Sequence, residues 1–177
     1  TNNNLEFGGL QVFNNSAEIY QFVSAQHLRK NQKFGHQEIS HRVVWSPGDW
    51  TNHNSNVTFN AIRAGATADY TYWNGEITQV VNLPCGFALV LDAEAQLANT
   101  NLLPSESFTL GGVNSVRGFE QNLLRADDGV RLSSELYTPG FSLLSHLDIE
   151  KLDCYCDRAR FFGFYDQAWA SQSNPLP

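Results

Sequence analysis

The residues FALVLDAEAQL at positions 87–97 alternate between two kinds of side chain with a period of two. On an extended chain, one face of this stretch carries Asp92, Glu94 and Gln96. The opposite face is apolar and consists of Leu91, Ala93, Ala95 and Leu97. Because successive side chains of a β-strand point to opposite faces, the stretch predicts a long strand with one polar and one apolar face.

The same alternation recurs along most of the chain, which predicts an all-β fold. Residues 130–137 place Arg131, Ser133 and Glu135 on one face, and residues 57–61 and 68–72 alternate in the same way. Turn sequences rich in Asn, Pro and Gly separate these runs. We expect about eight strands, near residues 4–13, 17–29, 34–45, 53–63, 66–81, 86–99, 124–138 and 158–170. Residues 141–157 are ambiguous between a short helix and an extended turn.

The length of the predicted strands leaves two architectures open. Many of them have ten or more residues, whereas strands of soluble proteins average about five to six. Long strands with one polar and one apolar face are typical of outer-membrane barrels. A large soluble β-sandwich has the same alternation, and there the apolar face of residues 91–97 would contact a second sheet instead of lipid. The 177 residues fit a single domain in either case.

Composition excludes several classes of protein and site. A net charge of −7 argues against a nucleic-acid partner, and no apolar run is long enough for a membrane-spanning helix. His36 and His41 are five positions apart, which does not suit two metal ligands on one helix face. The three cysteines, Cys85, Cys154 and Cys156, form neither a disulfide framework nor a metal motif. We therefore expect no metal, no cofactor and no catalytic residue, and predict that the chain is not an enzyme.

Residues 100–119, TNLLPSESFTLGGVNSVRGF, interrupt the alternation. A loop of about twenty residues without a periodicity of its own is uncommon and usually functional. Near its end Arg117 is followed by Gly118, and glycine lets a backbone turn tightly and approach a partner closely. The pattern predicts a loop, residues 100–123, that positions a charge.

This stretch resembles the signature loop of the haemolysin secretion/activation proteins of the ShlB/FhaC/HecB type, the two-partner secretion transporters within the Omp85 superfamily. In that family a Leu-Leu-Pro-Ser-Glu run leads to a Leu-Gly-Gly turn and a V-R-G-Y/F tetrad, which is similar to residues 102–119 here. The tetrad corresponds to Val116, Arg117, Gly118 and Phe119. The family's F-x-D motif is matched by Phe164 and Asp166. The resemblance covers most of the chain, is weakest at 141–157, and departs at Gln167, where the family often has glycine or alanine.

The resemblance implies a 16-stranded outer-membrane barrel that follows periplasmic POTRA domains. Its long loop folds into the lumen, where the tetrad arginine pairs with the aspartate of F-x-D. Carried over, Arg117 would pair with Asp166, with Phe119 and Phe164 packing nearby and Glu135 contributing to the same wall. Residues 1–177 would then be a partial C-terminal barrel domain, an internal fragment that spans strands six to thirteen, with loop 100–123 folded inward.

The resemblance also implies a function. The chain would belong to a bacterial outer-membrane transporter, surrounded by lipid, that exports a large haemolysin- or adhesin-type partner without a nucleotide. Two other functions stay open: an Omp85-type insertase of outer-membrane proteins, and a soluble β-sandwich that binds a ligand through residues 100–123. The Leu-Leu-Pro-Ser-Glu run at 102–106 favours secretion over insertion.

Overall fold

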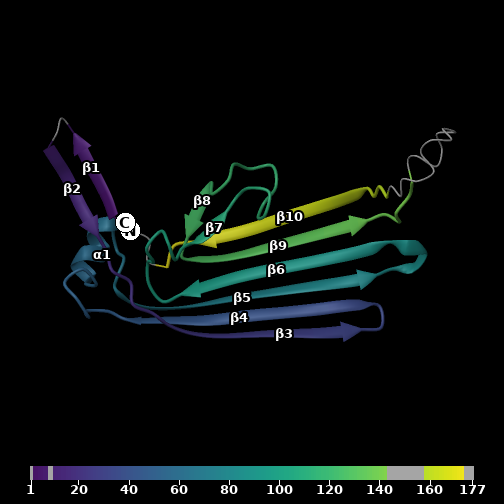
Figure 1. The fold of residues 1–177 in the computed structure, drawn as a ribbon, viewed down its shortest axis with the longest axis horizontal. Coiled ribbons are helices and arrows are strands. Elements are labelled where there is room, and N and C mark those ends of the chain that lie inside the picture. Colours follow the sequence, from purple (N-terminus) through teal and green to yellow (C-terminus); the bar gives the residue numbers. More distant parts are fainter. Residues whose placement is uncertain (1, 8–9, 143–157, 174–177) are drawn as a thin grey trace.

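The long strands form one open, antiparallel sheet. The computed structural model describes residues 2–7, 10–142 and 158–173. Six strands lie side by side in the order β10-β9-β6-β5-β4-β3 (Figure 1). They are β3 (Phe22–Gln32), β4 (Gly35–Pro47), β5 (Asp69–Asn82), β6 (Ala88–Ala98), β9 (Asp128–Tyr137) and β10 (Phe162–Ser171). The predicted fold class, an antiparallel β meander that does not close into a barrel, is confirmed.

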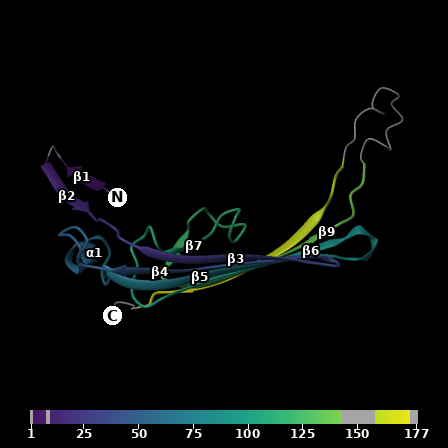
Figure 2. The ribbon, with the colours of Figure 1, turned by 60° about the horizontal axis from the view of Figure 1, so that its bottom comes forward.

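The register of the strands gives the sheet one polar and one apolar face. Asp92 of β6 lies opposite Ser133 of β9, and Ser133 lies opposite Asp166 of β10, so these side chains share the concave face. The sheet bends toward this side, where β7 and the loop around it also lie (Figure 2). The other face carries apolar side chains such as Leu91 and Leu97, the latter 59% exposed. Within the described ranges no second large sheet forms, so the facing sheets of a sandwich are not present there.

The strand predicted at residues 53–63 is wrong, because this segment contains the helix α1 (Asn56–Ile62). The Ser55 side chain caps the helix by accepting a hydrogen bond from the Thr58 backbone N–H at 3.4 Å. Phe59 is completely buried whereas Val57 is exposed, although both belong to the apolar set of the predicted strand. Burial of the Phe59 side chain thus fixes the orientation of this short segment. The alternation of apolar and polar residues in the segment does not show which apolar residue is buried.

Several other predicted elements differ from the structure. Residues 4–13 do not form one strand, because β1 (Asn2–Phe7) and β2 (Leu10–Ser16) pair as a hairpin. The predicted strand at 124–138 is divided at Asp127 into β8 (Leu124–Ala126) and β9. The predicted loop contains β7 (Phe108–Leu110), which pairs with β8. The strands predicted from residues 17 and 158 begin later, at Phe22 and Phe162, and residues 143–157 lie outside the described part.

A small hydrophobic core closes one end of the concave face. Here α1 and the first part of the long loop pack onto the ends of β4 and β5. The rings of Tyr70 and Tyr72 stack with their centroids 6.2 Å apart, and Phe59 lies 6.5 Å from Tyr70. The buried residues of this core are Val44, Phe59, Ala66, Ala68, Tyr70, Tyr72, Leu102 and Leu103. At the opposite end, β5 and β6 are joined through the one-turn helix η1 (Pro84–Gly86).

No helix in the described ranges is both long enough and apolar enough to cross a membrane.

Candidate functional site

The long loop between β6 and β8 reaches over the concave face of the sheet (Figures 1 and 2). After β7 the chain turns through Gly111 and Gly112, which have φ values of 102° and 99°. A Cβ atom at Gly111 would lie 2.3 Å from the carbonyl oxygen of Glu120, so only glycine lets the two arms of the loop approach this closely. Beyond this neck, the segment with the tetrad faces the sheet.

Arg117 forms a bidentate pair with Asp166 of β10. Its Nε donates to Asp166 Oδ2 at 2.7 Å and its Nη2 donates to Oδ1 at 2.6 Å. The backbone N–H of Arg117 also donates to Oδ2, at 3.0 Å. Two parallel charge-assisted bonds fix the orientation of the guanidinium as well as its position. The backbone contact additionally holds the main chain of the loop against the wall.

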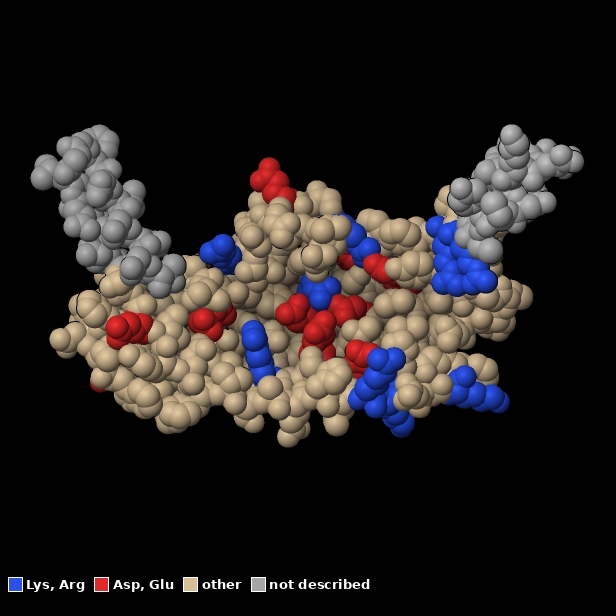
Figure 3. All heavy atoms as spheres, viewed as in Figure 1, with Lys and Arg blue, Asp and Glu red and all other residues tan. Residues whose placement is uncertain are grey.

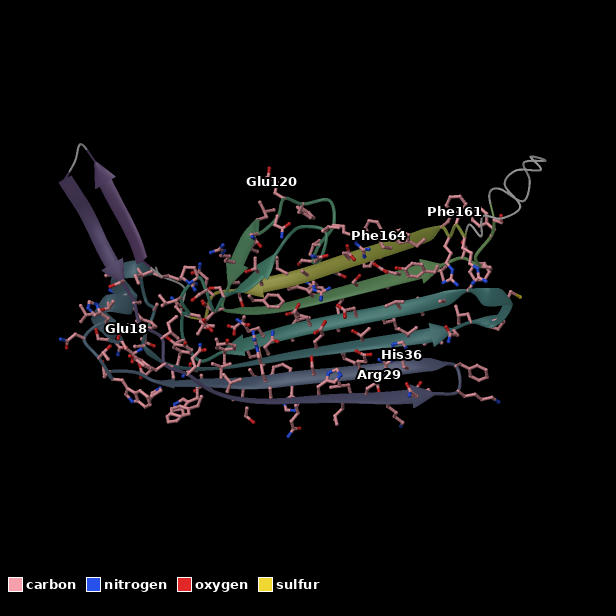
Figure 4. The ribbon with its side chains drawn as sticks, viewed as in Figure 1. Glu18, Arg29, His36, Glu120, Phe161 and Phe164 are labelled. Atoms are coloured by element: carbon pink, nitrogen blue, oxygen red, sulfur yellow. The ribbon has the colours of Figure 1, made fainter. Side chains whose placement is uncertain are left out.

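Two further strand residues and one ring complete the surroundings of the guanidinium. Glu135 of β9 accepts a hydrogen bond from Arg117 Nη1, and Ser133 Oγ accepts one from Nη2 at 3.0 Å. The Phe164 ring lies below the guanidinium, with 3.8 Å between the Arg117 carbon Cζ and the ring centroid, a cation–π geometry. Figure 4 shows Phe164 on β10, next to the loop. The structure thus brings the predicted wall residues Glu135, Phe164 and Asp166 together around Arg117.

The other tetrad residues have different surroundings. Gly118 adopts a φ of 90°, a conformation that favours glycine, and no atom lies within 4 Å of the place a Cβ would take. Phe119 is 60% exposed and forms no ring contact with any other described residue. The structure therefore places Phe164, and not Phe119, against the arginine.

The charges of this cluster are partly withdrawn from solvent. The Asp166 side chain is 2% exposed and that of Arg117 is 17% exposed. Hydrogen bonds to Asp166 raise the pKa of the Arg117 guanidinium, a group that is cationic at physiological pH in any case. A carboxylate with so little exposure is strongly destabilised when its cation is removed. Loss of Arg117 would therefore leave the nearly buried Asp166 carboxylate without a cation, whereas loss of Asp166 would leave Arg117 paired with Glu135 alone.

A second group of charges continues the cluster along the concave face. Arg131 of β9 pairs with Asp92 at 2.6 Å and with Glu94 at 3.3 Å, both on β6. Acidic side chains gather around basic ones at the centre of the face seen in Figure 3. Between loop and wall lies a cavity of about 320 Å³, whose lining includes Thr78, Asp92, Arg117, Arg131 and Glu135. In the described ranges, no group of three or more His, Cys, Asp or Glu side chains is arranged to hold a metal ion.

Sequence reasoning missed a second buried ion pair, between Arg63 and Asp127 at the base of the loop. Nη1 and Nη2 of Arg63 donate to the two carboxylate oxygens of Asp127 at 2.6 and 2.9 Å. Arg63 lies in a segment predicted as a strand, and the two residues are 64 positions apart in the sequence. The sequence feature that could have indicated this pair is Asp127 itself, a charged residue that interrupts the strand alternation between Ala126 and Gly129.

Comparison with known proteins identifies the family of the chain. No curated protein matches the chain. The family model of the haemolysin secretion/activation protein ShlB/FhaC/HecB matches residues 23–155, a span that includes Arg117 and Glu135 and ends before Phe164 and Asp166. With most of its length covered by this match, the chain belongs to the ShlB/FhaC/HecB family, whose members are outer-membrane transporters that act with a secreted partner protein.

Proposed function

We propose that the chain forms part of the wall of an outer-membrane barrel that exports a haemolysin- or adhesin-type protein. In this proposal the concave face lines the lumen, and loop 100–123 is docked there through Arg117. The observation that carries the proposal is the bidentate pair between Arg117 and Asp166, with Glu135 and Phe164 completing the dock. A dock of this kind gives the loop one defined position within the transport path.

The convex face supports a position within lipid. Its strands carry apolar side chains between two groups of exposed aromatic residues, at opposite ends of the sheet. Near α1, the rings of Phe22 and Trp45 stack at 5.4 Å, and Trp50 lies 5.7 Å from Phe22. Exposed aromatic residues at the other end include Phe34, Phe87 and Phe161. The ten-residue step from Trp45 to Gly35 spans roughly 33 Å along β4, or about 25 Å across a bilayer at the usual tilt of barrel strands, which matches an outer-membrane apolar band.

The free edges of the sheet support a larger barrel. Neither β3 nor β10 pairs with a further strand among the described residues. Unpaired edges of this length promote association with other chains, so a complete barrel would cover them with neighbouring strands. We therefore assign residues 1–177 to a partial C-terminal barrel domain of a 16-stranded transporter, with lipid on its convex face.

The lumen surface suits passage of an extended polypeptide. The carboxylates of Asp92 and Glu94 on β6 pair with Arg131 of β9, and those of Glu135 on β9 and Asp166 on β10 pair with Arg117 of the loop. Such a surface is polar, and many of its charges are paired with one another, so it offers hydrogen bonds to a passing backbone. The docked part of loop 100–123, around Arg117, lies over this surface and narrows the path.

Depletion of the complete transporter from the bacterium that produces it distinguishes export of a partner protein from the insertase alternative. We expect one large secreted protein to disappear from the culture medium while the amounts of other outer-membrane barrels remain unchanged. An insertase would give the opposite result, with a general fall in barrel proteins. Quantitative proteomics of medium and outer membrane measures both results in the same culture.

The two carboxylates around Arg117 are expected to differ in importance. Asp166 accepts three hydrogen bonds from Arg117 and one from Ser133, whereas Glu135 accepts one from the guanidinium and is more exposed. Asp166→Asn should therefore reduce partner secretion by about tenfold, and Glu135→Gln by about twofold. Secretion is measured in the medium and divided by the amount of folded barrel, seen as the heat-modifiable band on gels. Equal losses in the two variants would contradict the assigned roles.

A further inference from the structure

The base of the long loop is held by the buried pair of Arg63 and Asp127. Arg63 follows α1, and Asp127 lies between β8 and β9. The pair is bidentate, with N–O distances of 2.6 and 2.9 Å, and Asp127 is completely buried. A carboxylate withdrawn from water to this degree requires a full set of hydrogen-bond donors.

The pair holds the backbone of the loop at Leu102 from both sides. The Leu102 N–H donates to Asp127 Oδ1 at 2.8 Å, and the Leu102 carbonyl accepts a hydrogen bond from Arg63 Nη1. The second oxygen of Asp127 accepts a hydrogen bond from the Ser173 backbone N–H at 3.2 Å, just after β10. Arg63 and Asp127 therefore connect α1, the loop and the end of β10 in one cluster.

Other contacts of the root, defined as residues 100–110, reinforce this cluster. Glu106 accepts hydrogen bonds from the Tyr72 hydroxyl at 2.9 Å and from Gln21 Nε2 at 2.7 Å. The Phe108 ring occupies the space that a Cβ at Gly129 would need, 2.2 Å away, so β7 packs directly onto β9. The root is thus a folded part of the end of the sheet at which α1 lies.

The tip, defined as residues 113–119, is attached differently. Val113 is 71% exposed, and Phe119 is exposed as well. The described hydrogen bonds between tip and wall all originate from Arg117. The neck at Gly111 and Gly112 separates this segment from the root, and both glycines have positive φ values.

We propose that Arg63 and Asp127 are positioning residues that fix the root independently of the Arg117 dock. When Arg117 leaves Asp166, the tip is released at the neck while the root stays in place. The transporter then keeps the end with α1 assembled during export, and only a short segment of the loop leaves the lumen. The attachment of the root follows from the contacts themselves, and the movement of the tip rests on the proposed function.

Distances between spin labels in the complete transporter, reconstituted in lipid vesicles without a partner protein, test this inference. A reference label at Ser24 of β3 is paired with a label at Ser105 in the root, at Val113 in the tip, or at Ser134 in β9 as a control for the sheet. Pulsed electron resonance gives the width of each distance distribution. We expect narrow distributions for Ser105 and Ser134 in the unmodified protein.

The two attachments should respond separately. Arg117→Ala should widen the Val113 distribution about twofold and leave that of Ser105 unchanged, whereas Arg63→Ala should widen that of Ser105. Arg63→Ala could also widen the distance distribution of the Ser134 control, and Arg63→Lys is then the deciding variant. Lysine keeps the cation but loses the bidentate geometry, so this variant should widen the Ser105 distribution and leave that of Ser134 unchanged. The inference would be overturned if the Ser105 distance distribution stays narrow in Arg63→Ala. It would also be overturned if Arg117→Ala widens that distribution as much as Arg63→Ala does. Because no partner is present, these outcomes do not depend on whether the protein secretes one.

Discussion

Replacement of Arg117 by alanine is expected to reduce partner secretion by about tenfold or more while the barrel still inserts into the membrane. The variant leaves Asp166, which is 2% exposed, with Ser133 as its remaining side-chain partner, and it leaves Glu135 with the Tyr137 hydroxyl and without its cation. Breaking a fully buried ion pair costs about 3–5 kcal/mol, and a smaller cost is expected here because Arg117 is partly exposed. The variant destabilises the docked position of the loop and leaves the hydrogen bonds between the strands intact, so the sheet should still form.

Arg125→Ala provides the matched control for Arg117→Ala. Arg125 lies eight positions further along the same segment, is exposed, and forms no ion pair with another described residue. Its replacement removes the same charge without touching the dock, so secretion should remain unchanged. Secretion is quantified in the medium relative to folded barrel in the membrane. Undiminished secretion by Arg117→Ala, or an equal loss in Arg125→Ala, would count against the dock.

A charge on the convex face is expected to have the largest effect on the barrel itself. Ile77 is an exposed apolar residue near the middle of β5, between the two aromatic ends of the sheet. Arginine at the midplane of the lipid face of a barrel costs about 2–4 kcal/mol. Ile77→Arg should therefore lower the stability of the folded barrel by about this amount, measured by urea unfolding in lipid vesicles.

Thr78→Arg is the control for the lipid face. Thr78 is the next residue of the same strand and points to the opposite face, where its hydroxyl donates to Asp92 at 2.8 Å. An arginine there would lie in the polar cavity beside that carboxylate, at nearly the same depth in the membrane. Its effect on stability should be small. If the two variants destabilise the barrel equally, the convex face is not in contact with lipid.

The sequence predicted the sheet well because strand alternation is a local property. Asp92, Glu94 and Gln96 alternate with apolar residues, and the structure places this polar set on the concave face, where Gln96 is buried under the root of the loop. In residues 57–61 local alternation is not sufficient to identify the element. Five alternating residues also fit a short helix, and burial of Phe59 by a core from four separate segments decides between the two.

The site was predicted in part, for a different reason. The proximity of Arg117 and Asp166 was expected from a family resemblance, since no local pattern connects residues 49 positions apart. The pair of Arg63 and Asp127 depends on α1, on the break between β8 and β9, and on the folded root of the loop. Each of these was misassigned from local pattern, so their meeting point could not be predicted. Long-range ion pairs require the correct topology before side-chain chemistry can be applied.

Site-specific photo-crosslinking during export tests the central claim most directly, that the partner passes along the concave face beside the docked loop. A photoreactive side chain is placed at Val90, which lines the cavity with Arg117 and Glu135, or at Leu91, the next residue of β6 on the convex face. The proposed function predicts crosslinks to the exported partner from position 90 and none from position 91. Crosslinks from position 91 alone, or none from position 90 while secretion continues, would contradict it.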